Sequence, residues 1–139
     1  MLHRERYHTP GFTFMELVVA ILILGLLSAI GIPLYMRWAE SARETTTKQN
    51  LQLLKNNINL FHIEHGKYPT RLEDLVERPK GDLAKNWKQL LEKLPQDGWR
   101  QDFYYRVIPG GKHPYDLYSY GGSNGPEEPA EKRISAWEL

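Results

Sequence analysis

One carboxylate, Glu16, stands near the start of a long apolar run. From Phe12 to Tyr35 it is the only ionisable side chain apart from the terminal tyrosine. A lone charge in a segment long enough to cross a bilayer costs at least ~2.5 kcal/mol, so it usually marks a function and needs a partner. If the chain were cut after Gly11, a new amine at Phe12 would lie one helical turn from Glu16. That amine, or the one on a neighbouring copy, would neutralise the carboxylate.

The order of small, basic and apolar residues differs from that of a secretory signal peptide. There the small-residue cleavage site follows the apolar region, whereas Gly11 precedes it here. A cut at Gly11 would therefore leave the apolar segment on the mature protein. The alternative is an ordinary membrane anchor with Glu16 at the headgroup level. Arg4 and Arg6 precede the run and the next basic residue is Arg37, which predicts a cytoplasmic N-terminus and an exported C-terminal part.

The histidines do not form a recognisable catalytic or metal site. His62 and His65 lie three residues apart on a predicted helix, but two ligands do not make a metal site. A surface pair near a helix end, where the helix dipole favours protonated histidine, is the simpler interpretation. The sequence contains no nucleophile-elbow, zinc-protease or phosphate-loop motif. It therefore predicts a protein that is not an enzyme.

Size and charge restrict the class of protein further. The 139 residues carry a formal net charge of +1, and residues 1–11 hold two arginines and one glutamate, so the remainder has 16 basic and 16 acidic residues. A nucleic-acid binder normally shows a basic stripe, so we expect no nucleic-acid partner. About 35 residues form leader and span, which leaves enough for one small domain. Since the chain has no cysteine, stability must come from packing, a bound ion or neighbouring subunits.

One long helix is expected to carry Glu16. Pro33 lies inside the pattern and predicts a kink. A helix from Phe12 to about His65 would be ~80 Å long, which is too long for a domain of this size to cover. Its first half is therefore expected in lipid or against other copies. Its second half carries an apolar stripe that predicts a core-facing surface, made of Leu51, Leu54, Ile58 and Phe61.

Short helices and then strands are expected after this helix. Gly66 is predicted to cap it, and Thr70 with Glu73 fits a capping box at the start of a short helix. Residues 83–94 are predicted to contain a second short helical stretch. Residues 103–108 and 115–120, rich in aromatic and β-branched side chains, predict an antiparallel hairpin across the stripe. The tail is expected to pack back through Ile134 and Trp137.

The stretch Gly11-Phe12-Thr13-Phe14-Met15-Glu16-Leu17 resembles the class III signal of type IV pilins and type II secretion pseudopilins. The resemblance implies that a prepilin peptidase cuts after Gly11 and N-methylates Phe12. It also implies that Glu16 directs subunits into a fibre by docking against a neighbour's Phe12 amine. Pro33 lies where the family commonly has a proline, in a region that can melt as subunits pack. The implied parts are a leader (residues 1–11), a transmembrane and assembly segment (12–35) and a periplasmic pseudopilin domain (36–139).

Further motifs resemble the major, G-type pseudopilin of the type II secretion system more than a type IV pilin. They are Gly66-Lys67-Tyr68-Pro69, Leu94-Pro95 with Asp97 and Trp99, Tyr115-Asp116-Leu117-Tyr118-Ser119 with Gly121, and Trp137-Glu138-Leu139. The resemblance implies an α+β, type IV pilin-like fold with a long N-terminal helix, a small antiparallel sheet and short helices.

This resemblance also implies a function. The protein would be a structural subunit in the inner membrane of a Gram-negative bacterium. It would polymerise into a periplasmic pseudopilus that drives export of folded proteins across the outer membrane, and its partners would be other pseudopilins and an inner-membrane assembly platform. The alternatives are a type IV pilus subunit for adhesion, motility or DNA uptake, and a lone membrane-anchored periplasmic binding module.

The chain departs from the family pattern in its C-terminal loop, where members usually bind calcium. Calcium takes roughly six to eight oxygen ligands, several of them carboxylates. The family's first aspartate is replaced by Ser123 or Asn124, and its later aspartate pair by Glu131 and Arg133. We therefore expect no cofactor, with Arg133 replacing the ion by pairing with a nearby glutamate. The remaining weak calcium candidates are Glu127, Glu128 and Glu131.

Overall fold

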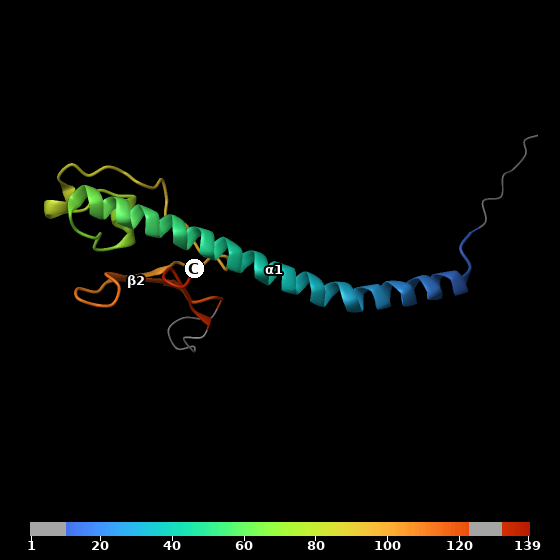
Figure 1. The fold of residues 1–139 in the computed structure, drawn as a ribbon. Coiled ribbons are helices and arrows are strands. Elements are labelled where there is room, and N and C mark those ends of the chain that lie inside the picture. Colours follow the sequence, from blue (N-terminus) through green and yellow to red (C-terminus); the bar gives the residue numbers. More distant parts are fainter. Residues whose placement is uncertain (1–10, 123–131) are drawn as a thin grey trace, which may run out of the picture. The chain divides into compact units, whose positions relative to one another are not determined.

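The computed structural model describes residues 11–122 and 132–139. The chain divides into two compact units, one ending at Ala39 and one spanning Glu40–Leu139. One helix, α1 (Phe14–His65), runs through both (Figure 1). The long N-terminal helix and the α+β class are thus confirmed. The other elements are the 3-10 turns η1 (Leu72–Leu75) and η2 (Gly81–Ala84) and the strands β1 (Tyr104–Val107), β2 (Tyr115–Ser119) and β3 (Ile134–Ser135).

The end of α1 follows from its last residues. Gly66 has φ +69°, and its N–H donates to the His62 carbonyl at 2.8 Å. A left-handed residue directly after the last turn is a common helix stop, and glycine adopts it without a Cβ penalty. The predicted cap is therefore confirmed. Pro33 lies within the helix assignment, which continues through it, and the kink itself stays a prediction.

The core of the second unit forms where the sheet lies along the later part of α1 (Figure 1). The predicted stripe residues Leu51, Leu54, Ile58 and Phe61 are all fully buried. Burial alternates along β2, so that Tyr115, Leu117 and Ser119 face inward, as the two-residue period of a strand requires. The expectation that the hairpin buries the stripe is confirmed.

The sheet has three antiparallel strands in the order β1-β2-β3. The β1–β2 hairpin was predicted, but β3 was not, because a two-residue strand carries no periodic signal. The predicted return of the tail is confirmed: Ile134 and Trp137 pack against the core. The Trp137 indole N–H donates to the Tyr115 carbonyl at 3.0 Å, and Lys55 donates to the Ala136 carbonyl at 2.9 Å.

The capping prediction at Thr70 and Glu73 is wrong in its residues. The turn η1 follows Arg71, and Asp74 accepts hydrogen bonds from the N–H groups of Thr70 and Arg71 at 2.9 and 3.2 Å. Asp74 is buried, whereas Glu73 is exposed. The buried carboxylate of Asp74 therefore accepts the hydrogen bonds that the exposed carboxylate of Glu73 was expected to accept.

The predicted helical stretch over residues 83–94 is also wrong. The turn η2 ends at Ala84, and Asn86 has φ +57°. The N–H groups of Leu90 and Leu91 both donate to the Leu75 carbonyl at 3.0 Å. Tertiary hydrogen bonds thus satisfy two of this segment's backbone N–H groups, and its apolar side chains reach the core without a helix.

The buried tyrosines make the second unit sensitive to high pH. Burial raises the pKa of Tyr105 far above its ordinary value of 10.0 and the pKa of Tyr115 to about 12. Below about pH 10 these phenols are protonated in the folded and unfolded chains alike, so their burial contributes fully to the free energy of unfolding. As the pH rises from about 10 to 12, the unfolded chain releases the Tyr115 proton while the folded chain retains it. Stability must therefore fall over this interval.

We expect the free energy of unfolding to decrease from about pH 10 to pH 12, and to decrease less steeply in Tyr115→Phe. Among the described residues, the Tyr115 hydroxyl donates one long hydrogen bond, to the Asn59 amide oxygen at 3.5 Å, so phenylalanine removes little else there. Denaturant titrations of the two proteins at several pH values measure the slopes. Equal slopes would show that Tyr115 ionises as freely in the folded as in the unfolded chain.

Candidate assembly site

The start of α1 is closed by a reciprocal pair of hydrogen bonds. The Glu16 N–H donates to the Thr13 hydroxyl at 3.2 Å, and the Thr13 N–H donates to the Glu16 carboxylate at 3.5 Å. This is a capping box, which satisfies two N–H groups that would otherwise lack a partner. The positive end of the helix dipole also favours a carboxylate here. In a single subunit, Glu16 is thus held by its own helix.

The capping role was missed in the sequence, although Thr13 and Glu16 have the spacing of a capping box. Gly11, Phe12 and Glu16 are all exposed. Phe12 is 78% exposed, and a Cβ placed on Gly11 would meet no atom within 4 Å. The structure therefore brings the three residues into one accessible N-terminal segment, although no described contact tests their processing or docking.

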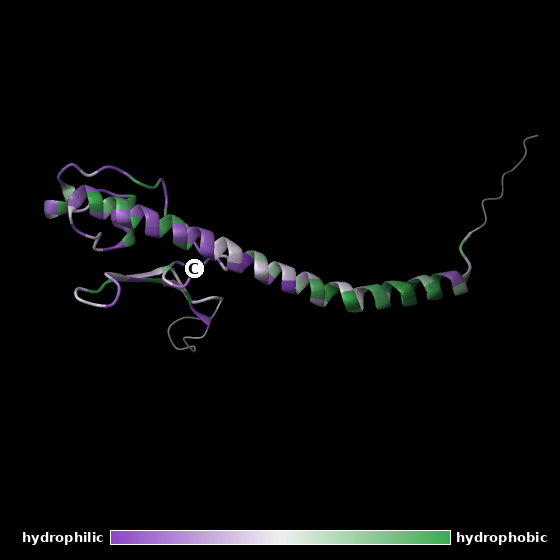
Figure 2. Ribbon diagram, in the orientation of Figure 1, coloured by the Kyte–Doolittle hydropathy of each residue, from purple (hydrophilic) through white to green (hydrophobic). Residues whose placement is uncertain are grey.

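The helix after this cap is apolar on all sides (Figure 2). No residue of its most apolar window is buried, and by length and composition the helix is able to cross a membrane. An apolar surface of this extent is not stable in water and requires lipid or protein around it. The large side chains that are more than 60% exposed include Phe14, Met15, Ile21, Leu22, Leu24, Leu26, Leu27, Ile30, Tyr35, Met36 and Trp38.

In the second unit, a buried aspartate organises the base of the C-terminal loop. Asp97 is 4% exposed. Its Oδ1 accepts from the N–H groups of Trp99 and Gln101 at 2.9 and 2.8 Å, and its Oδ2 accepts from the Ser119 hydroxyl at 2.6 Å. The Ser119 oxygen in turn accepts from the Gly121 N–H at 3.0 Å. The carboxylate therefore joins a turn to the end of β2.

The same turn is fixed to α1 through a threonine. The Thr47 hydroxyl donates to the Arg43 carbonyl at 2.8 Å and accepts from the Gly98 N–H at 2.9 Å. Gly98 is packed so closely that a Cβ would lie 2.3 Å from the Arg43 carbonyl oxygen. Asp97 and Trp99 belong to a motif that can be recognised in the sequence, whereas no local pattern indicates the role of Thr47.

The weak calcium candidates Glu127, Glu128 and Glu131 lie outside the described residues, as do Ser123 and Asn124, which stand where the resembled family has its first aspartate. Within residues 11–122 and 132–139, no three His, Cys, Asp or Glu side chains gather as metal ligands.

The described histidines near the end of α1 contact aromatic rings. The His62 ring stacks on Tyr68, with centroids 4.0 Å apart, and His65 meets Phe61 edge-on at 4.3 Å. The two histidines are half-buried, so the expected surface pair is partly covered.

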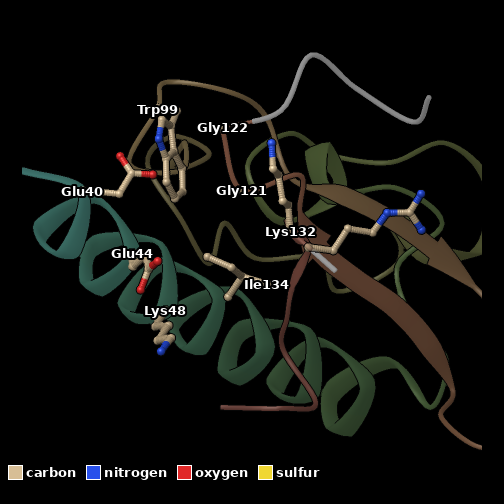
Figure 3. A pocket seen from close by; sticks show the side chains of 9 residues that line it. Glu40, Glu44, Lys48, Trp99, Gly121, Gly122, Lys132 and Ile134 are labelled. Atoms are coloured by element: carbon tan, nitrogen blue, oxygen red, sulfur yellow. The ribbon is translucent and has the colours of Figure 1, made fainter. Parts of the chain in front are cut away.

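A cavity of about 440 Å³ lies beside Trp99, Gly121 and Gly122 (Figure 3). One wall is the α1 face carrying Glu40, Glu44 and Lys48; the others include Trp99 and Lys132. Charges of both signs line it, and Glu40 is also 3.5 Å from Arg43 on the same helix. The cavity therefore has no single charge character.

The sequence of this chain is similar to the sequences of known proteins. The sequence profile described as "Type II secretion system (T2SS), protein G" matches residues 35–137, so this match does not depend on the motif at Gly11. The chain belongs to this family. It is 35% identical to the type II secretion system core protein G of Pseudomonas aeruginosa over 123 residues, covering 84% of this chain and 86% of the relative. The corresponding protein of Escherichia coli K12 is 34% identical over 135 residues, covering 93% and 91%.

A solved structure agrees with the family assignment. The crystal structure of the major pseudopilin from the type 2 secretion system of enterohaemorrhagic Escherichia coli matches with a TM-score of 0.62 and 26% identity, covering 75% of this chain and 94% of that one. The type IV pilin-like α+β fold and the prediction of a type II secretion pseudopilin are confirmed. Pseudopilins of this family are structural proteins. That this chain lacks enzymatic activity stays a prediction.

Proposed function

We propose that this protein polymerises into the periplasmic pseudopilus of a type II secretion system and so drives the export of folded proteins across the outer membrane. The observation that carries the proposal is the exposed and uncharged part of α1 from Leu17 to Met36, which is apolar except for a few residues. Such a surface suits lipid before assembly and other copies afterwards. Family membership supports this function over that of a type IV pilus subunit or a lone binding module.

The capping box supports a specific docking step. In the free subunit the Glu16 carboxylate contacts Thr13 at 3.5 Å, which is a weak bond that a better donor can replace. A positively charged Phe12 amine on a neighbouring copy is such a donor. Within an apolar bundle, a paired carboxylate is far less costly than a lone one. Glu16 then serves first as a helix cap and later as the docking charge.

The exposed segment also agrees with the proposed processing and location. The protein would lie in the inner membrane as a single-pass subunit, with a cytoplasmic N-terminus and a periplasmic domain. A prepilin peptidase would cut the accessible bond between Gly11 and Phe12 and methylate Phe12. Other pseudopilins and an inner-membrane assembly platform would be its partners.

Deletion of the gene tests the function directly. We expect the deletion strain to retain exoproteins in the periplasm and to recover secretion when the full-length chain is restored. Normal secretion together with lost twitching motility or DNA uptake would favour a type IV pilus. No effect on secretion, motility or uptake would favour a lone binding module.

Mass spectrometry of the protein purified from membranes tests the processing. We expect a mature chain that begins at Phe12 and carries one added methyl group. A Gly11→Leu variant is the matched comparison, because it alters only the residue before the cut; it should retain its leader. A wild-type chain that begins anywhere else would refute the assignment of Gly11 and Phe12.

A further inference from the structure

The length of the uncharged part of α1 matches the thickness of a bilayer. Residues 17–36 carry no charge and span about 30 Å as a helix, which is the thickness of the hydrocarbon core. Glu16 precedes this part and Arg37 follows it. A helix that crosses a membrane at this place therefore keeps both charges out of the hydrocarbon, where they would be costly.

Two aromatic side chains with polar tips lie beside Arg37. Tyr35 and Trp38 are 71% and 67% exposed. Because they are three residues apart in α1, they lie on one face of the helix. Tyrosine and tryptophan prefer the interface between membrane and water, where the ring contacts apolar chains and the hydroxyl or N–H contacts water. The two rings thus suit the level at which the uncharged part of α1 ends.

Charged residues follow directly after this aromatic pair. Glu40 and Arg43 form an exposed ion pair at 3.5 Å, and Glu44 and Lys48 are exposed as well. Each of these charges would be costly inside the hydrocarbon, so the helix has to be in water from Glu40 onward. The level of the interface is therefore limited to the turn of α1 between Leu34 and Glu40.

A second copy of the chain is the alternative occupant of this surface. Close packing between helices in lipid favours small residues that let the backbones approach, whereas Tyr35, Met36 and Trp38 present large exposed side chains. Arg37 is exposed among them. It would have to leave water in a close helix pair, but at the headgroup level its guanidinium reaches lipid phosphates. These side chains therefore fit lipid headgroups better than a neighbouring helix.

We propose that Tyr35 and Trp38 anchor the free subunit in the phospholipid headgroup layer on the side of the membrane where the C-terminal domain lies. Together with Arg37 they fix how deeply α1 is inserted. This proposal rests on the proposed membrane location, but not on secretion or fibre assembly. Normal secretion in a deletion strain would refute the proposed function and leave the depth of insertion unaffected.

Quenching of Trp38 fluorescence by brominated lipids measures the depth of its ring. The full chain is placed in lipid nanodiscs at one copy per disc, which excludes contact with a second copy. The discs contain phosphatidylcholine brominated either near the headgroup or near the ends of the acyl chains. We expect strong quenching by the shallow bromines and weak quenching by the deep ones. Stronger quenching by the deep bromines, or none by either, would overturn the proposal.

The signal of Trp38 can be separated from that of the other tryptophans. Trp87, Trp99 and Trp137 all belong to the second unit. The variant Trp38→Phe measures their share, and it should lose the quenching by the shallow bromines. Quenching that persists in Trp38→Phe would come from the second unit and would also contradict the proposal.

Single thiols locate the edge of the membrane, because the chain itself has no cysteine. The thiolate is the reactive form, and it is disfavoured in hydrocarbon. Leu34→Cys should therefore react with a membrane-impermeant maleimide roughly 100-fold more slowly than Ser41→Cys in the same discs. Equally fast reactions would show that α1 is not inserted, which contradicts the membrane location as well as the anchor. Protection of both thiols would contradict the anchor alone.

Two further variants show whether the rings hold the helix at this depth. Tyr35→Leu combined with Trp38→Leu keeps this turn apolar but removes the preference for the interface. The helix should then sink, and the reaction at Ser41→Cys should slow about threefold. Phe14→Leu is the matched control, because Phe14 is an 81% exposed aromatic residue without a polar tip near the other end of the uncharged part. It should leave the rate unchanged, and equal rates in the two variants would contradict the anchoring role.

Discussion

Glu16→Gln should abolish fibre assembly while leaving the subunit folded and in the membrane. Glutamine at this position can still cap the helix, because a capping box accepts Glu or Gln. It cannot pair with a neighbour's Phe12 amine as a charge. Losing an ion pair in apolar surroundings costs on the order of 3 kcal/mol, which corresponds to about 100-fold weaker association for each contact.

Two companion variants show whether the charge or the cap is responsible. Thr13→Ala removes the hydroxyl that accepts from the Glu16 N–H at 3.2 Å but keeps the carboxylate, so assembly should continue. Glu40→Gln removes an exposed carboxylate elsewhere on α1 and should have little effect on assembly. Sheared-fibre recovery and exoprotein secretion measure the outcome. Wild-type assembly by Glu16→Gln would refute the docking role.

Gly98→Ala should be the most damaging small substitution in the second unit. The new Cβ would lie 2.3 Å from the Arg43 carbonyl oxygen and 2.5 Å from the Arg43 Cα. Both are backbone atoms of a helix, so the turn must move away as a whole. That movement weakens the 2.9 Å hydrogen bond from Gly98 to Thr47 and displaces Asp97. We expect a loss of about 3 kcal/mol in the free energy of unfolding.

Gly111→Ala is a matched glycine substitution with a milder expected effect. There a new Cβ would lie 2.8 Å from a side-chain methyl of Ile108 and 3.1 Å from the His113 carbonyl oxygen, so it approaches backbone atoms less closely than at Gly98. Denaturant unfolding of both variants measures the difference. If Gly98→Ala were no less stable than Gly111→Ala, the close contact between the turn and α1 would not be a feature of the folded protein.

Elements with a repeating pattern could be predicted from the sequence. The stripe at Leu51, Leu54 and Ile58 predicted the buried face of α1, and Gly66 predicted its end. Both signals depend on residues within a few positions of each other, because helical geometry repeats every three or four residues. The hairpin was predictable for the same reason, since the buried Tyr115 and Leu117 alternate with half-buried neighbours.

Residues 83–94 show where such local reasoning fails. Their apolar spacing is compatible with a helix, but the Leu75 carbonyl, which accepts from Leu90 and Leu91, offers their backbone a partner far away in the sequence. A tertiary hydrogen bond can override a weak helical preference. The segment therefore reached the core in a form that no local pattern indicated.

The N-terminal motif shows what the sequence by itself determined: the single charge of Glu16 and the apolar run that follows it are adjacent in the chain, so both can be recognised without the fold. Only the tertiary structure shows which residues meet around the turn at Asp97 and the end of β2. Asp97 meets Ser119, Gly98 meets Thr47, and Arg133 meets Tyr118 across separations that no local period records. The physical reason is that a buried polar group or a cation takes whichever partner the folded chain places beside it.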